Sequence, residues 1–189
     1  MVHVRKIEEN VLTFIVSGKL WRNSLVMQDK ETGSLWSHIT GICLEGEHKG
    51  ATLQQMPAVQ TTWAQWIADH PKTRVLKKSE EIKSSQYQSY FDDPDRTGLF
   101  RTFWLEDRMP GKAIVHGITL GPHALAVTDD ALKSGEALQH DLGGVKVTIT
   151  RSVDGGVRAV RSDTDEELQV LVSYWFAWSA FYPNTAVAE

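Results

Sequence analysis

Two segments of the chain, 62–73 and 174–185, carry the same rare residues at the same spacing, and no other feature constrains the fold as strongly. Each contains a Trp-x-x-Trp pair, so four of the seven tryptophans lie in these two stretches. The matched positions are Trp63 with Trp175, Trp66 with Trp178, Ala68 with Ala180, His70 with Tyr182, Pro71 with Pro183, and Thr73 with Thr185. Such a match is hard to explain by chance and predicts an internal duplication.

Each segment is predicted to form a short helix. In the first, Trp63, Trp66 and Ile67 stand at i, i+3 and i+4, which places them on one helical face. Pro71 disfavours a helical conformation at the residue before it and ends the helix there. A tryptophan pair at this spacing is typical of core anchors, because each indole buries a large apolar area and needs one partner for its N–H. The alternative is an aromatic platform for a sugar or another flat ligand.

A weaker repeat relates 5–14 to 151–160, since each has the pattern of a strand, a polar turn and a second strand. Two further apolar runs, 25–28 and 34–39, flank a polar turn that ends in Gly33 and predict a hairpin. Other strands are expected at 11–16, 74–76, 113–120, 124–127, 145–150 and 157–160. The sequence therefore predicts a strand-rich α+β fold of duplicated meander or hairpin units, each closed by a short tryptophan-containing helix.

The repeat also predicts the organisation of the chain. We expect a first unit at 1–76, an aromatic connecting strap at 77–112, and a second, shorter unit at 113–189, packed together or as one compact domain. With 189 residues, 41% of them hydrophobic, the chain can bury a sizeable core. The first unit retains an insert beginning at 25–36 that the second lacks, so any ligand site is expected there.

The charge balance excludes some classes of partner. A net charge of −4 with a pI near 6.0 gives no electrostatic basis for binding nucleic acid. No apolar stretch approaches the length of a membrane span, and residues 1–10 lack the apolar core of a signal peptide. As written, the chain is expected to be soluble and cytoplasmic, with an extracytoplasmic location expected only if its N-terminus is truncated.

Chemical motifs are sparse. The single cysteine, Cys43, has apolar neighbours, which predicts a buried and inert thiol. The seven histidines form no His-x-His or His-x-x-x-His pair, and the phosphate-loop, dinucleotide and hydrolase glycine motifs are absent from the sequence. The run Asp93 to Gly98 resembles the start of a calcium loop, but Trp104 stands where the bidentate glutamate should be. We therefore expect no cofactor and no metal.

Three segments carry a family resemblance: 16–36, Thr62-Trp-x-x-Trp-x-x-x-His-Pro71, and Tyr174-Trp-Phe-Ala-Trp-x-x-Phe-x-Pro183. They resemble the bacterial and archaeal family called domain of unknown function 3179. The resemblance implies a duplicated, strand-rich domain and brings no established activity. Members tend to carry a Cys-Pro-x-Cys motif before the segment matching 4–14, and many are exported. This chain lacks that motif, so it is expected to be a shortened member.

Two functional hypotheses of different classes remain. The first is a non-catalytic module that binds an unknown small molecule or protein, or serves as a structural unit. Its candidate ligand-binding residues are Ser17, Asn23, Asp29, Ser34, Trp36, His38 and His70. The second is an enzyme whose site is assembled in the first unit, with His38 or His70 as a base and Asp29 or Glu31 orienting it. That hypothesis requires a cleft that brings a histidine and a carboxylate within hydrogen-bond distance.

Overall fold

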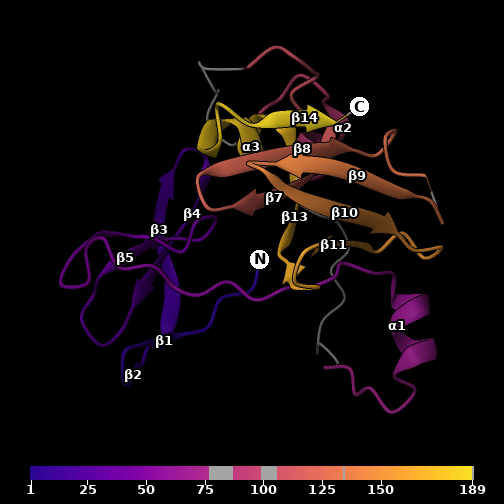
Figure 1. Cartoon of the computed structure of the whole chain (residues 1–189). Coiled ribbons are helices and arrows are strands. Elements are labelled where there is room, and N and C mark those ends of the chain that lie inside the picture. Colours follow the sequence, from indigo (N-terminus) through magenta and orange to yellow (C-terminus); the bar gives the residue numbers. More distant parts are fainter. Residues whose placement is uncertain (77–86, 99–105, 134, 189) are drawn as a thin grey trace.

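The structure, a computed structural model, describes residues 1–76, 87–98, 106–133 and 135–188. Within these ranges the chain forms three four-stranded sheets, a small two-stranded hairpin and three short helices (Figure 1). The prediction of a strand-rich α+β fold is confirmed. One sheet belongs to the first half of the chain and two to the second half.

The first half forms a meander. Its strands are β1 (Lys6–Ile7), β2 (Asn10–Val11), β3 (Phe14–Trp21), β4 (Ser24–Asp29), β5 (Leu35–Ser37) and β6 (Cys43–Glu45). β1 and β2 pair as a separate hairpin, and the other four form an antiparallel sheet in chain order. The predicted hairpin around Gly33 is confirmed as β4 and β5. A small core of Leu12, Trp36, Cys43 and Leu53 lies under this sheet.

The second half has two sheets stacked face to face (Figure 1). Its strands are β7 (Ile114–Leu120), β8 (His123–Thr128), β9 (Ala137–Leu142), β10 (Val145–Arg151), β11 (Val157–Arg161), β12 (Glu167–Leu168), β13 (Val170–Tyr174) and β14 (Ala186–Ala188). One sheet has the order β13-β7-β8-β14 and the other β12-β11-β10-β9. Among the strand pairs of the described residues, only β14–β8 is parallel. The strands predicted at 113–120, 124–127, 145–150 and 157–160 are confirmed as β7, β8, β10 and β11, and they pair as two antiparallel hairpins.

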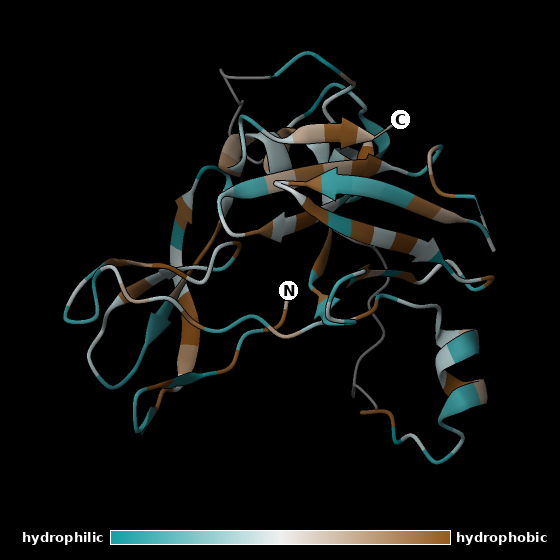
Figure 2. Cartoon of the chain, viewed as in Figure 1, coloured by the Kyte–Doolittle hydropathy of each residue, from teal (hydrophilic) through white to brown (hydrophobic). Residues whose placement is uncertain are grey.

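The pattern of apolar residues explains this layering. Burial alternates along β10, where Val147 and Ile149 are fully buried and Lys146, Thr148 and Thr150 are not. Apolar and polar bands alternate along the same strand in Figure 2. β7 is instead buried on both faces: Ile118 faces the β10 sheet, and Val115 faces helix α3 (Trp175–Phe181). The β13-β7-β8-β14 sheet is therefore the middle layer of the second half.

Helix α3 packs on the middle sheet through its tryptophans. Trp175 and Trp178 are almost completely buried, and the Trp178 ring lies so close to Gly117 that a Cβ there would fall 2.1 Å from it. Because Gly117 has no side chain, the indole can pack directly against the backbone of β7. The indole N–H of Trp178 donates to the Thr185 hydroxyl at 3.0 Å. Phe181 also meets Trp21 of the first half, edge to face, at 5.1 Å between ring centroids.

Helix α1 (Trp63–Asp69) repeats the local structure of α3. Both helices have seven residues, begin after an extended residue and end at a residue with φ near −126° and ψ near 65°. Trp66 donates to Thr73 at 2.9 Å, as Trp178 donates to Thr185. In each helix the second tryptophan lies 4.2 Å from the next ring, that of His70 in α1 and of Tyr182 in α3. The helices predicted from the sequence repeat are thus confirmed.

The surroundings of the two helices differ. α1 has no buried residue and stands away from the sheets (Figures 1 and 2). Trp66 is 43% exposed, whereas Trp178 is 2% exposed. The prediction that Trp66 is a buried anchor is therefore wrong, because no sheet lies beneath α1 in the part of the chain that the structure describes. Closure of the first unit by its helix, and the duplication itself, stay predictions.

Two other expectations concern the segment after α1. The predicted strand at 74–76 is wrong. These residues form no strand and pair with no other strand in the described part of the chain, and Val75 and Leu76 face solvent. The predicted strap at 77–112 lies partly outside the described residues, at 77–86 and 99–105. Between those gaps the chain forms α2 (Gln88–Asp92).

The paired helices give a matched test of burial. We expect Trp178→Ala to destabilise the protein by about 3–5 kcal/mol, because it opens a large cavity over the middle sheet. Trp66→Ala removes the same kind of side chain and the same indole-to-threonine hydrogen bond, yet it should cost no more than about 1 kcal/mol, because the indole is already hydrated. Urea denaturation of both variants measures the difference. Equal losses would contradict the burial shown by the structure.

Candidate functional site

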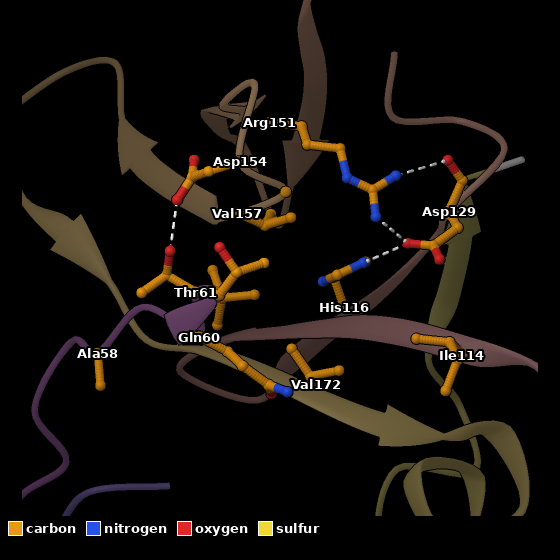
Figure 3. Close-up of a pocket in the computed structure, with 13 residues that line it drawn as sticks. Ala58, Gln60, Thr61, Ile114, His116, Asp129, Arg151, Asp154, Val157 and Val172 are labelled. Carbon is orange, nitrogen blue, oxygen red and sulfur yellow. Dashed lines mark hydrogen bonds and ion pairs between the residues drawn. The ribbon is translucent and has the colours of Figure 1, made fainter. Parts of the chain in front are cut away.

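A cavity of about 240 Å³ lies where the segment leading to α1 crosses the second half (Figure 3). One wall comes from 58–62 and the others from β7, β13, the end of β8 and the β10–β11 turn. It is lined by Ala58, Gln60, Thr61, Thr62, Ile114, His116, Asp129, Arg151, Asp154, Gly155, Val157, Val170 and Val172. Valine and isoleucine side chains thus face a small set of polar and charged groups, which is the usual make-up of a small-molecule pocket.

His116 is the most buried of the polar groups in this cavity, with 4% of its surface exposed. It stands in the middle of β7, opposite Val127 of β8 and Val172 of β13. A histidine in an otherwise apolar row costs free energy unless its ring nitrogens are hydrogen-bonded. Its Nε2 lies 2.7 Å from Oδ1 of Asp129, the residue that follows β8.

Asp129 is held in turn by Arg151 at the end of β10. The guanidinium donates to Oδ1 of Asp129 at 2.6 Å and to the main-chain carbonyls of Asp129 and Leu132 at 3.4 Å. Burial alone raises the pKa of the Asp129 carboxyl, but the hydrogen bond from His116 and the charge of Arg151 outweigh it, so the pKa lies below its ordinary value. Asp129 is therefore ionised at neutral pH.

An ionised carboxylate can only accept hydrogen bonds, so Nε2 of His116 must carry the proton that it shares with Asp129. In the neutral imidazole, Nδ1 is then an acceptor. That atom is buried, has no hydrogen-bond partner among the described residues, and points into the cavity (Figure 3). A buried acceptor without a partner is unusual and indicates a group that a ligand can satisfy.

The opposite side of the cavity is closed by a contact between the two halves of the chain. The hydroxyl of Thr61 donates to Oδ2 of Asp154, in the β10–β11 turn, and the hydroxyl of Ser152 donates to its Oδ1. The hydrogen bonds from Ser152 and Thr61 lower the pKa of the Asp154 carboxyl, so it is ionised as well. Asp154 thus places a second negative charge across the cavity from His116.

The proton position on His116 can be tested directly. We expect long-range ¹H–¹⁵N spectra of the wild-type protein to show the Nε2–H tautomer in the neutral imidazole, because Asp129 accepts from that nitrogen. In Asp129→Asn the amide can donate instead, and the Nε2–H tautomer should lose its preference. Asp130→Asn, at the exposed neighbouring position, is the control and should leave the tautomer unchanged. An Nδ1–H tautomer in the wild type would contradict this geometry.

The residues predicted from sequence lie elsewhere, and three of them meet in the first half. Trp36 donates its indole N–H to Oδ2 of Asp29 at 2.8 Å, and the main-chain N–H of Thr32 donates to Oδ1 at 2.6 Å. Ser34 is completely buried and bonds the Thr32 hydroxyl. Together these contacts fix the turn between β4 and β5. Asp29 and its neighbours therefore have their polar atoms occupied within the turn.

Asp29 also gives a prediction about pH. Burial alone raises the pKa of this carboxyl, but the hydrogen bonds from Trp36 and Thr32 outweigh it, so the folded-state pKa is lowered. The resulting stabilisation is complete above the unfolded-state pKa of about 3.9 and is lost as the pH falls through the lower folded-state value. We expect Asp29→Asn to cost about 1–3 kcal/mol at neutral pH.

This deficit should shrink as the pH falls below about 4, because the wild-type protein then loses the same interaction. Urea denaturation across that range measures it. Glu47→Gln, at an exposed carboxylate in the turn after β6, is the control and should change stability little. A deficit that stays constant into the acid range would contradict the lowered pKa.

The other predicted residues are dispersed. Ser17 donates to the carbonyl of Val26 at 2.5 Å, and Asn23 has a positive φ in the β3–β4 turn. The main-chain carbonyl oxygen of His38 lies 2.8 Å from Nε2 of His3. The ring of His70 packs against that of Trp66. Burial lowers the pKa of both His3 and His38. A ligand-binding role for these residues stays a prediction, and the structure places them on separate parts of the surface and core.

No pattern in the sequence identified His116, Asp129, Arg151 or Asp154 as candidate site residues. The one available signal was His116 itself, a titratable residue within the apolar run 113–120 that was predicted to be a strand. Its partners are 13 and 35 positions away, so their approach depends on the pairing of β7, β8 and β10. Cys43, in contrast, is buried as predicted, and burial raises the pKa of its thiol.

The described residues show neither a metal-binding cluster nor a membrane-spanning helix. Over the ranges 1–76, 87–98, 106–133 and 135–188, no group of three or more His, Cys, Asp or Glu side chains is placed to hold a metal ion. Within the same residues, no helix combines the length and the apolar character needed to span a membrane.

Fold and cavity together define a strand-rich α+β protein with a polar pocket between its two halves. The profile of the family described as "Protein of unknown function (DUF3179)" matches residues 1–169. The chain belongs to this family, as the tryptophan segments indicated. Searches among curated proteins and among solved structures each found no match.

Proposed function

We propose that the chain is a binding protein for a small molecule, which it holds in the cavity beside His116. The observation that carries this proposal is the buried Nδ1 of His116, which points into the cavity without a partner among the described residues. An unsatisfied buried acceptor costs about 1–3 kcal/mol, and a ligand that donates a hydrogen bond removes this cost on binding. The protein thus keeps an acceptor fixed and desolvated before the ligand arrives.

The rest of the cavity suits this role. Asp129 and Arg151 hold the imidazole in one orientation, so the acceptor needs no rearrangement. Ile114, Val157 and Val172 supply apolar walls. The Thr61–Asp154 contact ties the segment before α1 across the opening. These features support a binding module of the kind inferred from the sequence, although its site lies at the junction of the halves and not within the first unit.

A second candidate function is enzymatic, and the His116–Asp129 pair favours it. A carboxylate that accepts from one ring nitrogen orients the other to act as a general base. This is the juxtaposition that the enzyme hypothesis required, with His116 and Asp129 in place of His38 or His70 and Asp29 or Glu31. It supports proton abstraction from a bound ligand, and a binding experiment at His116 is the first test of either function.

The test is a ligand-observed NMR screen of small polar fragments against three proteins. We expect fragments to bind the wild type, and protein-observed spectra of the same mixtures should show that they shift the imidazole resonances of His116. His116→Phe keeps a ring but removes the acceptor, and should weaken binding about tenfold, the equivalent of one hydrogen bond of about 1.4 kcal/mol. His70→Phe is the matched control, because an aromatic ring already occupies the equivalent position 182, and should bind as the wild type does. Fragments that bind all three proteins equally would refute a ligand site at His116.

A further inference from the structure

The charge and hydrogen-bonding groups of the cavity specify the chemical class of its ligand. We propose that the ligand is a small primary amine with a short apolar substituent, bound as its ammonium ion. This inference rests on the proposed function and narrows it. Three independent features of the cavity lead to it: the direction of the open hydrogen bond, the balance of charge, and the apolar walls.

The open hydrogen bond requires a donor from the ligand. With Nε2 donating to Asp129, Nδ1 of the neutral His116 can only accept. His116 is more than nine-tenths buried, and its Nδ1 points into the cavity, so a ligand there can supply the donor. A carboxylate or phosphate ligand has no proton to offer at neutral pH. A hydroxyl or an amine does, and the remaining features choose between these two.

The charge balance favours a cation. Asp129 and Asp154 each contribute a negative charge, and Arg151 is the one cationic side chain among the residues that line the cavity. The pKa values of both carboxyls are lowered, so two negative charges face the single positive charge of Arg151. The guanidinium of Arg151 is directed to Asp129 and the carbonyl of Leu132, so it neutralises its own partner and leaves Asp154 uncompensated. A primary ammonium, with three donors, can serve Nδ1 and the charge of Asp154 together.

The walls and the volume limit the rest of the molecule. Ile114, Val157, Val170 and Val172 also line the cavity, so an alkyl substituent is accommodated better than a second polar group. A cavity of about 240 Å³ holds only a small molecule. The expected ligand is therefore amphipathic, with its ammonium between His116 and Asp154 and a short hydrocarbon against the valines.

A series of similar shape tests the class. The probes are 1-propylamine, 1-propanol, propionate and N,N,N-trimethylpropylammonium, titrated into the full chain and followed by the NMR signals of the probes, which report on the wild type and on every variant alike. We expect propylamine to bind at least tenfold more tightly than propanol, because only the amine adds charge to the same hydrogen bond. Propionate should show no binding. The quaternary ammonium should bind more weakly than propylamine, because it carries the charge but cannot donate to Nδ1.

Three variants separate the contributions. Asp154→Asn should weaken propylamine by about tenfold and leave propanol unchanged, whereas His116→Phe should weaken both. Thr61→Val breaks the contact with Asp154 but keeps its charge, and it should retain the preference for the amine. Circular dichroism and urea denaturation establish that each variant is folded before its binding is interpreted.

The outcomes distinguish the two proposals. Equal affinity for propanol and propylamine, or a preference for propionate, would overturn the amine class and leave ligand binding at His116 intact. If Thr61→Val lost as much of the preference for propylamine over propanol as Asp154→Asn does, the preference would depend on the Thr61–Asp154 hydrogen bond. That result would overturn the argument from the charge of Asp154. Absence of binding by all four probes would overturn the amine class, while the broader fragment screen decides on ligand binding itself.

Discussion

The contact of the Trp178 indole with Gly117 of β7 determines how the second half is built. An indole this large can lie flat on a sheet only where a strand offers no side chain, and the glycine of β7 provides that place. The helix then covers one face of the β13-β7-β8-β14 sheet, and the β10 sheet covers the other. Because β7 is packed on both faces, the orientations of the side chains on those faces are fixed as well. His116, adjacent to Gly117 in sequence, points to the opposite face and owes its orientation to this packing.

The comparison of α1 with α3 separates local from tertiary effects. The two helices share their length, their terminal conformations, the indole-to-threonine hydrogen bond and the stacked ring. Six matched positions within twelve residues are enough to produce that structure, since every one of these interactions lies within the segment. Burial is different. Trp178 has a sheet with a glycine beneath it, whereas Trp66 faces solvent. The same sequence motif therefore specifies a helix and its hydrogen bonds, but not the surface on which the helix rests.

The cavity at His116 depends on both halves. Its histidine and one carboxylate come from β7 and the end of β8, its guanidinium from β10, and its outer wall from the segment before α1. The Thr61–Asp154 hydrogen bond joins residues 93 positions apart and keeps that segment against the β10–β11 turn. Ligand binding at this cavity would therefore also affect the position of the segment before α1 and of the β10–β11 turn, because both line it.

The sequence by itself determined the two tryptophan helices, the β4–β5, β7–β8 and β10–β11 hairpins, and the buried Cys43, since each follows from local spacing, turn residues or a continuous apolar run. It gave no indication of β9, and it placed a strand at 74–76, where the described part of the chain offers no strand to pair with. It also directed attention to polar residues such as Asp29 and Ser34, which are buried in a turn. Only the tertiary structure decided which tryptophans are covered and brought His116, Asp129, Arg151 and Asp154 to one cavity. The reason is that strand pairing joins residues far apart in the chain, and no local pattern encodes which strands become neighbours.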